Sequence, residues 1–186
     1  MKKSIMTSAC VFVLSAFLLG AAPAGRTEGV FEQPILLTSA GQSADVQLAN
    51  VLIKKAGLSC TLGKLAADKD LEGHKTLILV LGASLKGLGA AGLDMAKENA
   101  RVEGLLAAAK AKNIPLLCLH LGGADRRGQT TDEMTAAYLP QARMAIIVKS
   151  GNQDGFFTKI CQSHNIPLVE AEKTIDAADP IKKAFK

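Results

Sequence analysis

The stretch from His120 to Gly128 carries the residues best suited to binding an anion. Arg126 and Arg127 stand next to each other in this glycine-containing loop, just ahead of a predicted helix. A guanidinium group grips a carboxylate or phosphate through paired hydrogen bonds, and the first turn of a helix offers further N–H donors. The loop is therefore predicted to bind a small anion. The alternative interpretation pairs the arginines with nearby acids, namely Asp125, Asp132 and Glu133.

A second loop suited to an anion runs from Thr38 to Ser43. Its residues Thr38, Gly41 and Ser43 resemble the phosphate loop of flavodoxins, whereas Ala40 departs from that pattern where a hydroxyl residue is usual. Free backbone N–H groups and the positive end of the following helix dipole would attract the anion. The alternative is purely structural, because a serine can cap a helix and a glycine can permit a turn.

The glycine loop from Gly82 to Gly92 contains the pattern G-x-G-x-x-G, but it differs from a dinucleotide fingerprint. The first glycine of a fingerprint follows its strand directly, whereas 83–86 intervene before Gly87, and His120 stands where an acidic ribose ligand is needed. NAD is therefore disfavoured. Leu88 stands where a Walker motif needs lysine. We expect this loop to contribute Ser84 and Lys86 to a ligand site.

No cofactor or metal is predicted. Flavin mononucleotide (FMN) is the cofactor alternative that the first loop favours, but Phe156 and Phe157 are the nearest aromatics and are expected to be buried. The cysteines after residue 24 match no zinc spacing, and their odd number allows at most one internal disulfide. They are Cys60, Cys118 and Cys161.

A hydrolase is the main rival to a binding protein, with His120 as its base. The serines available as nucleophile are Ser39 and Ser84, and the acids available to orient the histidine are Asp94, Asp125 and Asp154. The nucleophile-elbow pattern G-x-S-x-G is absent, and these residues share no diagnostic spacing. Catalytic residues are therefore left unassigned, with His120, Ser84 and Asp125 as candidates and a structural role for His120 as the alternative.

Short apolar runs alternate with longer amphipathic stretches along the chain, which indicates parallel strands joined by helices. Strands are predicted at 34–38, 59–62, 76–81, 116–121, 142–148 and 167–169, and helices at 44–56, 94–112, 130–140, 153–163 and after Asp179-Pro180. The segment from Thr130 to Glu133 has the pattern of a capping box. Asn113 and Asn165 each stand two residues before a proline and are suited to the left-handed conformation at the end of a helix.

The predicted fold class is α/β, a three-layer, doubly wound, mostly parallel sheet of 5–6 strands of the flavodoxin-like type. Strand-to-helix loops of such a sheet gather at its carboxyl edge, where ligands bind. The residues expected to line that site are Thr38, Ser39, Gly41, Gln42, Ser43, Ser84, Lys86, Gly87, Gly89, Gly122, Gly123, Arg126, Arg127 and Asp154. We expect a binding domain for an anionic metabolite. A partner-binding module for a membrane complex or transporter is a further alternative.

The N-terminus has the features of a signal peptide. Lys2 and Lys3 precede an apolar stretch from Ala9 to Leu19, and Ala22-Pro23-Ala24 supplies small residues for a peptidase. This pattern predicts residues 1–24 as the signal, one α/β domain over 25–186, a secreted or extracytoplasmic location and no stable membrane insertion after cleavage. An uncleaved anchor is the alternative. Nucleic acid is excluded as a partner because the basic residues are scattered and not interleaved with aromatics.

Four segments together resemble an uncharacterised family of small secreted bacterial proteins with a flavodoxin-like or Rossmann-like doubly wound domain. They are Thr38–Ser43, Gly82–Gly92, His120–Gly128 and Gly151–Phe157. The resemblance covers nearly all of the chain after the signal, from Pro34 to Ala184. It implies secretion and this fold, and it attaches no activity.

Export can be tested by sequencing the N-terminus of the exported protein. Cleavage after Ala24 predicts Gly25 as the first residue, because the small residues at 22–24 fit the peptidase site. Met1 retained on protein in the membrane fraction would show an anchor instead.

Overall fold

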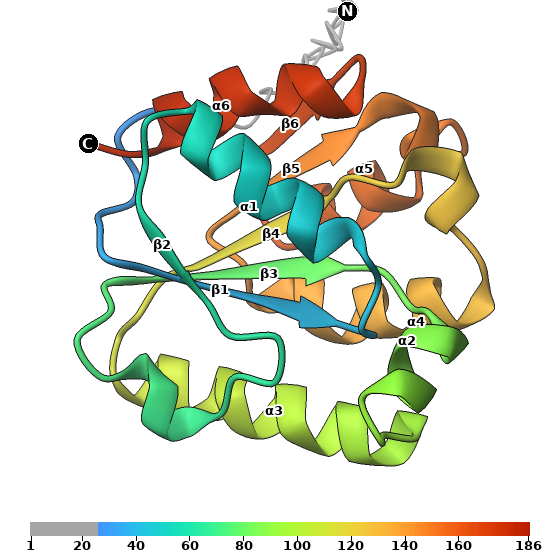
Figure 1. Ribbon diagram of the computed structural model, residues 1–186. Helices are drawn as coiled ribbons and strands as arrows, with labels where there is room; N and C mark the ends of the chain where they lie inside the picture. The colour runs from blue at the N-terminus through green and yellow to red at the C-terminus, as the bar shows by residue number, and fades with distance from the viewer. Residues whose placement is uncertain (1–25) are drawn as a thin grey trace, which may run out of the picture.

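The computed structural model describes residues 26–186, so the predicted signal peptide and its cleavage site lie outside the described residues. Within them, six parallel strands form one sheet in the order β2-β1-β3-β4-β5-β6 (Figure 1). The strands are β1 (Ile35–Ala40), β2 (Cys60–Leu62), β3 (Thr76–Leu81), β4 (Leu116–His120), β5 (Met144–Val148) and β6 (Leu168–Ala171). This architecture confirms the predicted fold class.

Helices cover both faces of the sheet (Figure 1). One face carries α1 (Asp45–Lys55) and α6 (Ala178–Ala184), and the other carries α3 (Met95–Ala111), α4 (Gln129–Tyr138) and α5 (Phe156–Ser163). A short helix, α2 (Leu85–Ala90), follows β3. Single 3₁₀ turns occupy Asp68–Leu71, Gly123–Arg126, Leu139–Gln141, Lys149–Asn152 and Thr174–Ala177. No helix between residues 26 and 186 is long and apolar enough to cross a bilayer.

The central strands owe their uninterrupted apolar sequences to burial on both sides. All six residues of β3 are buried. Its alternate side chains enter different cores, since Ile78 and Val80 pack with α1 and α6 whereas Leu77 and Leu79 pack with α3, α4 and α5. The three described cysteines are free thiols, and burial raises the pKa of both Cys118 and Cys161.

The strand order reverses between β1 and β3. The chain passes from β1 outward to β2 and then returns to build β3 to β6 on the other side of β1. In doubly wound sheets this reversal opens a crevice at the carboxyl ends of the two strands, and ligands usually occupy it. The residues after β1 and β3 are therefore the first place to look for a site.

Two local predictions were wrong. The expected glycine loop 82–92 contains α2, because the Ser84 hydroxyl caps it by accepting from the Gly87 N–H at 3.1 Å and Leu88 is buried beneath it. The expected capping box does not open α4, which begins at Gln129 after Gly128 with no side-chain cap. The left-handed helix ends are confirmed, with φ of 56° at Asn113 and 55° at Asn165.

Candidate functional site

The loops that follow β1, β3, β4 and β5 meet at the carboxyl edge of the sheet. Gln42 and Ala83 form an isolated bridge between the first two loops. The Arg126 Nε donates to Asp45 Oδ2 at 3.1 Å, which ties the third loop to the first turn of α1. The Arg127 guanidinium donates to the Gly151 carbonyl and so joins the third loop to the fourth. The sheet thus brings the predicted site residues to one edge.

The crevice between β1 and β3 is closed by the chain itself. The Gly82 N–H donates to the Ala40 carbonyl at 3.0 Å, the Ser84 N–H to Gly41 at 2.8 Å, and the Ser43 N–H back to Gly82 at 3.2 Å. Gly41 has φ of 92°, and a Cβ there would lie 2.6 Å from the Cα of Ala83. The two loops are therefore in backbone contact where a flavodoxin-like fold would admit a ligand.

A buried carboxylate on α3 accepts one backbone N–H and one side-chain amide of the first loop. Glu98 is fully buried, and its Oε1 accepts from the Gly41 N–H at 2.9 Å and from Gln42 Nε2 at 3.1 Å. Arg101 neutralises it with two hydrogen bonds of 2.8 Å, and also donates to the Ser39 carbonyl at 2.6 Å. The position predicted for a ligand anion thus holds the Glu98 carboxylate.

Sequence reasoning missed Glu98, although the sequence carried one signal for it. Glu98 precedes Val102 by four residues and Leu105 by seven, which places it on the apolar face of α3. A carboxylate on that face is almost never fully buried unless it is paired, and Arg101, three residues on, supplies the partner. The sequence signal for a buried ion pair was therefore a glutamate on the apolar face of the predicted helix, with an arginine three residues later.

The hydroxyl residues of the first loop are buried beneath it. Thr38 and Ser39 are both fully buried. The Thr38 hydroxyl donates to the Lys64 carbonyl at 3.4 Å, and the Ser39 Oγ has no partner within residues 26–186. Ser43 is also buried, and its Oγ accepts from the Asp45 N–H at 3.3 Å. None of these hydroxyls is presented to solvent for a ligand.

Every N–H donor of the Arg127 side chain is hydrogen-bonded within the protein. A guanidinium has five N–H donors, and all five have acceptors here. Its Nε and Nη2 donate to the two carboxylate oxygens of Asp132 at 2.6 and 3.0 Å. Its Nη1 and Nη2 donate to the two oxygens of Asp154 at 3.0 and 2.9 Å. The second N–H of Nη1 donates to the Gly151 carbonyl. Asp132 and Asp154 raise the pKa of Arg127, and Arg127 lowers the pKa of Asp154 to about 2.

Arg127 also lies against aromatic rings, with its guanidinium carbon 4.6 Å from the centroid of Phe156 and 5.5 Å from that of Phe157. Such contacts between a cation and an aromatic face add to the attraction of its carboxylate partners. Arg127 therefore holds the third and fourth loops together, as the alternative interpretation of the arginines proposed for Asp132. Asp154 faces this arginine.

Arg126 is differently placed. Only its Nε has an acceptor within residues 26–186, the Asp45 carboxylate, and its side chain is 32% exposed whereas that of Asp45 is 6% exposed. A Cβ at Gly82 would lie 2.9 Å from Arg126 Cγ, and a Cβ at Gly122 would clash with Arg126 Cβ. The two glycines thus leave room for the arginine to lie across the ends of β3 and β4.

Other predicted ligand residues lie on α2 or in the loop after β4. Lys86 is exposed and forms no ion pair within the described residues. Gly87 packs so closely on the first loop that a Cβ there would clash with the Gln42 carbonyl. Gly89 is exposed with open space around it, and Gly123, with φ of 58°, packs on the hydroxyl of Ser150. Among these residues, Lys86 alone offers a further cation.

His120 is enclosed by backbone. Its Nδ1 lies 3.1 Å from the Leu81 carbonyl and its Nε2 lies 3.1 Å from the Gly123 carbonyl. Its ring lies 4.9 Å from that of Phe157 between centroids. The imidazole is fully buried, and this burial lowers its pKa. The ring therefore lies between the ends of β3 and β4 as a structural element, and a neutral imidazole donates to only one of the two carbonyls.

The candidate catalytic residues are not brought into contact. Neither ring nitrogen of His120 bonds a serine or a carboxylate within residues 26–186. Ser84 caps α2, and Asp125 is exposed with no ion pair among the described residues. Asp94 caps α3 through the Lys97 N–H at 2.8 Å. The described part of the chain assembles no group of three or more metal-ligating side chains.

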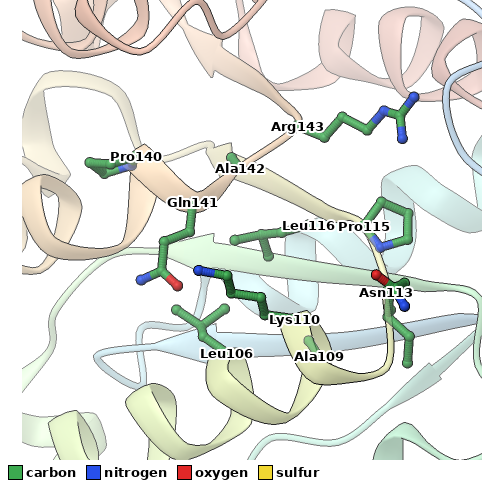
Figure 2. A pocket seen from close by; sticks show the side chains of 11 residues that line it. Leu106, Ala109, Lys110, Asn113, Pro115, Leu116, Pro140, Gln141, Ala142 and Arg143 are labelled. Carbon is green, nitrogen blue, oxygen red and sulfur yellow. The ribbon is translucent and has the colours of Figure 1, made fainter.

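Two hollows differ in size and place. A small one of about 190 Å³ lies at the carboxyl edge beside the start of α4, lined by Ala83, Leu85, Arg127, Gly128, Gln129, Thr130 and Thr131. A larger one of about 520 Å³ lies at the amino edge, lined by the end of α3 and the segments entering β4 and β5 (Figure 2). The larger hollow was not predictable from the sequence, because its lining residues are ordinary turn and helix residues.

Comparison with known proteins places the chain in a family without adding an activity. The model of a family described as a domain of unknown function (DUF6305) matches residues 32–185. No curated protein matches the chain. A solved structure of a mutant of the esterase AlinE4 is similar at 12% identity over 76% of each chain, with a TM-score of 0.29. Nothing about activity follows from similarity at that level.

The Glu98 network predicts a large loss of stability for Glu98→Ala. Removing one partner of a buried ion pair leaves the other charge uncompensated, so the free energy of unfolding should fall by about 3–5 kcal/mol in urea titrations. Glu103→Ala is the matched control, because Glu103 is exposed on the same helix and its loss should change stability by less than about 0.5 kcal/mol. Equal effects of the two substitutions would contradict the network.

Burial of His120 predicts a stability that falls in mild acid. The folded pKa lies below the ordinary value, so the unfolded chain binds the proton first. Stability is then fully present above about pH 6.5 and is lost as pH falls below it, by up to about 1.4 kcal/mol per pH unit. Urea titrations from pH 7.5 to 5 should show a smaller slope of stability against pH for His120→Gln than for wild type. An unchanged slope in His120→Gln would contradict this account.

Proposed function

This chain belongs to the DUF6305 family, whose description names no activity, and from the geometry we propose that it is an exported domain that binds a small anion at the carboxyl edge of its sheet. The anion is a phosphate-type or carboxylate-type metabolite, and Arg126 is its principal contact. The observation that carries the proposal is that four of the five donors of Arg126 have no acceptor within residues 26–186, whereas every donor of Arg127 has one.

The chemistry of Arg126 supports this assignment. A guanidinium presents paired N–H groups that match the oxygens of carboxylate and phosphate, and such charge-assisted bonds are stronger than neutral ones. Arg126 lies where β3 and β4 end, and about a third of its side chain is exposed. Lys86, exposed on α2 at the same edge, adds positive charge there.

The Asp45 carboxylate competes with a ligand anion for the Arg126 guanidinium. This buried carboxylate holds the Nε of Arg126 at 3.1 Å and so positions the guanidinium. The same negative charge repels an incoming anion and reduces the positive potential around Arg126. Arg126 should therefore raise the affinity for an anion, and the charge of Asp45 should lower it.

The test is calorimetric titration of inorganic phosphate and of sulfate into wild type and two variants. Asp45→Asn should bind phosphate more tightly than wild type, because the competing charge is removed. Asp45→Asn combined with Arg126→Gln should bind at least about tenfold more weakly than Asp45→Asn alone, because one charge-assisted bond is worth about 1.5–3 kcal/mol. The double variant removes the ion pair as a unit, so no buried carboxylate is left unpaired.

Lys149→Gln is the matched control. Lys149 follows β5 at the same edge, is exposed and pairs with Glu172 at 2.7 Å. Its loss changes the net charge by the same amount as the loss of Arg126 but should leave phosphate binding unchanged. The assignment of Arg126 would be refuted if the double variant bound phosphate as tightly as Asp45→Asn does. It would also be refuted if Lys149→Gln weakened phosphate binding by the same factor as the addition of Arg126→Gln to Asp45→Asn does.

A further inference from the structure

The larger hollow at the amino edge has the composition of a ligand site. Its volume of about 520 Å³ falls in the range of small-molecule pockets. Its apolar floor is buried and consists of Leu106, Ala109, Leu116 and Ala142. Its rim carries polar side chains that are exposed, namely Lys110, Asn113, Gln141 and Arg143. An apolar floor with a few polar groups around it is the usual arrangement of a site for an organic ligand.

The charge of this hollow has one sign. Lys110 and Arg143 line it, and no aspartate or glutamate of the described chain does. Neither cation forms an ion pair within residues 26–186. Lys110 stands in the last turn of α3, where a cation also complements the helix dipole. Arg143 stands in no helix, just before β5, so neither a helix end nor a carboxylate accounts for it.

The two cations occupy different ends of the hollow. In Figure 2 the Lys110 amino group points toward the side chain of Gln141, whereas the Arg143 guanidinium points away from both, on the other side of Leu116. Arg143 also lines a further hollow of about 280 Å³ that contains Arg26 and Lys186, where Lys186 pairs with Glu32 at 2.6 Å. Arg26 thus extends the positive charge outward from the Arg143 end.

The walls are held by backbone hydrogen bonds. The Ile114 N–H donates to the Ala109 carbonyl at 2.9 Å and the Arg143 N–H to the Leu116 carbonyl at 2.8 Å. Asn113, with φ of 56°, turns the chain sharply out of α3. The segment that carries Arg143 is therefore tied to β4, and the turn that follows Lys110 is held to the end of α3.

We propose that this hollow is a second binding site, separate from Arg126, and that it takes a linear organic dicarboxylate. One carboxylate is bound by Lys110 beside Gln141, the other by Arg143, and the methylene chain lies over the apolar floor at Leu116. A cation at each end selects for two negative charges, and the apolar floor selects for a hydrocarbon body between them. An inorganic anion satisfies only one of these requirements.

The test is calorimetric titration of suberate, the eight-carbon dicarboxylate, into the purified protein, with octanoate and inorganic phosphate for comparison. Suberate should bind about tenfold more tightly than octanoate, because octanoate lacks one charge-assisted contact. Lys110→Gln and Arg143→Gln should each weaken suberate binding by about tenfold. Both side chains are exposed, so the melting temperature should stay close to that of wild type.

Two controls separate this site from Arg126. Lys112→Gln removes an exposed lysine next to α3 that does not line the hollow and should leave suberate binding unchanged. The Asp45→Asn and Arg126→Gln double variant should also bind suberate as wild type does. No suberate binding up to millimolar concentration, binding unaffected by both Lys110→Gln and Arg143→Gln, or loss of binding in the double variant would each overturn the proposal.

Discussion

The carboxyl edge of this protein depends on the buried carboxylate of Glu98. It reaches from α3 across to the first loop, binds the Gly41 N–H and the Gln42 amide, and is neutralised by Arg101. A charge buried this deeply is stable only when paired and hydrogen-bonded. Because those bonds hold the loop after β1 in place, the loop can lie in backbone contact with the loop after β3. The crevice that doubly wound folds offer to a ligand is filled as a result.

With the crevice closed, the residues at the carboxyl edge have different roles. Arg127, surrounded by Asp132 and Asp154, and His120, placed between two carbonyls, hold the loops together. Arg126, unlike Arg127, keeps most of its donors in reach of solvent, beside a single competing carboxylate. The opposite edge, where helices end and strands begin, carries the larger hollow and its two cations. We therefore propose different anion chemistry at the two edges of a fold that usually concentrates binding at one.

The fold was predictable from sequence because its signals are local. The uninterrupted apolar run of β3 indicated a strand covered on both faces, and Asn113 and Asn165 marked helix ends through their conformational preference. The glycines of 82–92 argued against a helix, yet the Ser84 cap and the burial of Leu88 outweigh their low propensity. The partners of the buried and loop carboxylates could not be predicted, since Glu98 meets Gly41 across 57 positions and Asp154 meets Arg127 across 27.

The most direct test of the account is NMR observation of individual amides and arginine Nε–H groups during titration with phosphate. If Glu98 fills the first loop and Arg126 is the anion contact, phosphate will shift the Arg126 Nε–H signal and the amides of Gly82 and Gly122 beneath it. The Gly41 amide and the Gln42 side-chain amide will stay where they are. Shifts concentrated at Gly41 and Gln42, with Arg126 unmoved, would show that the first loop releases Glu98 to bind the anion and would contradict the account.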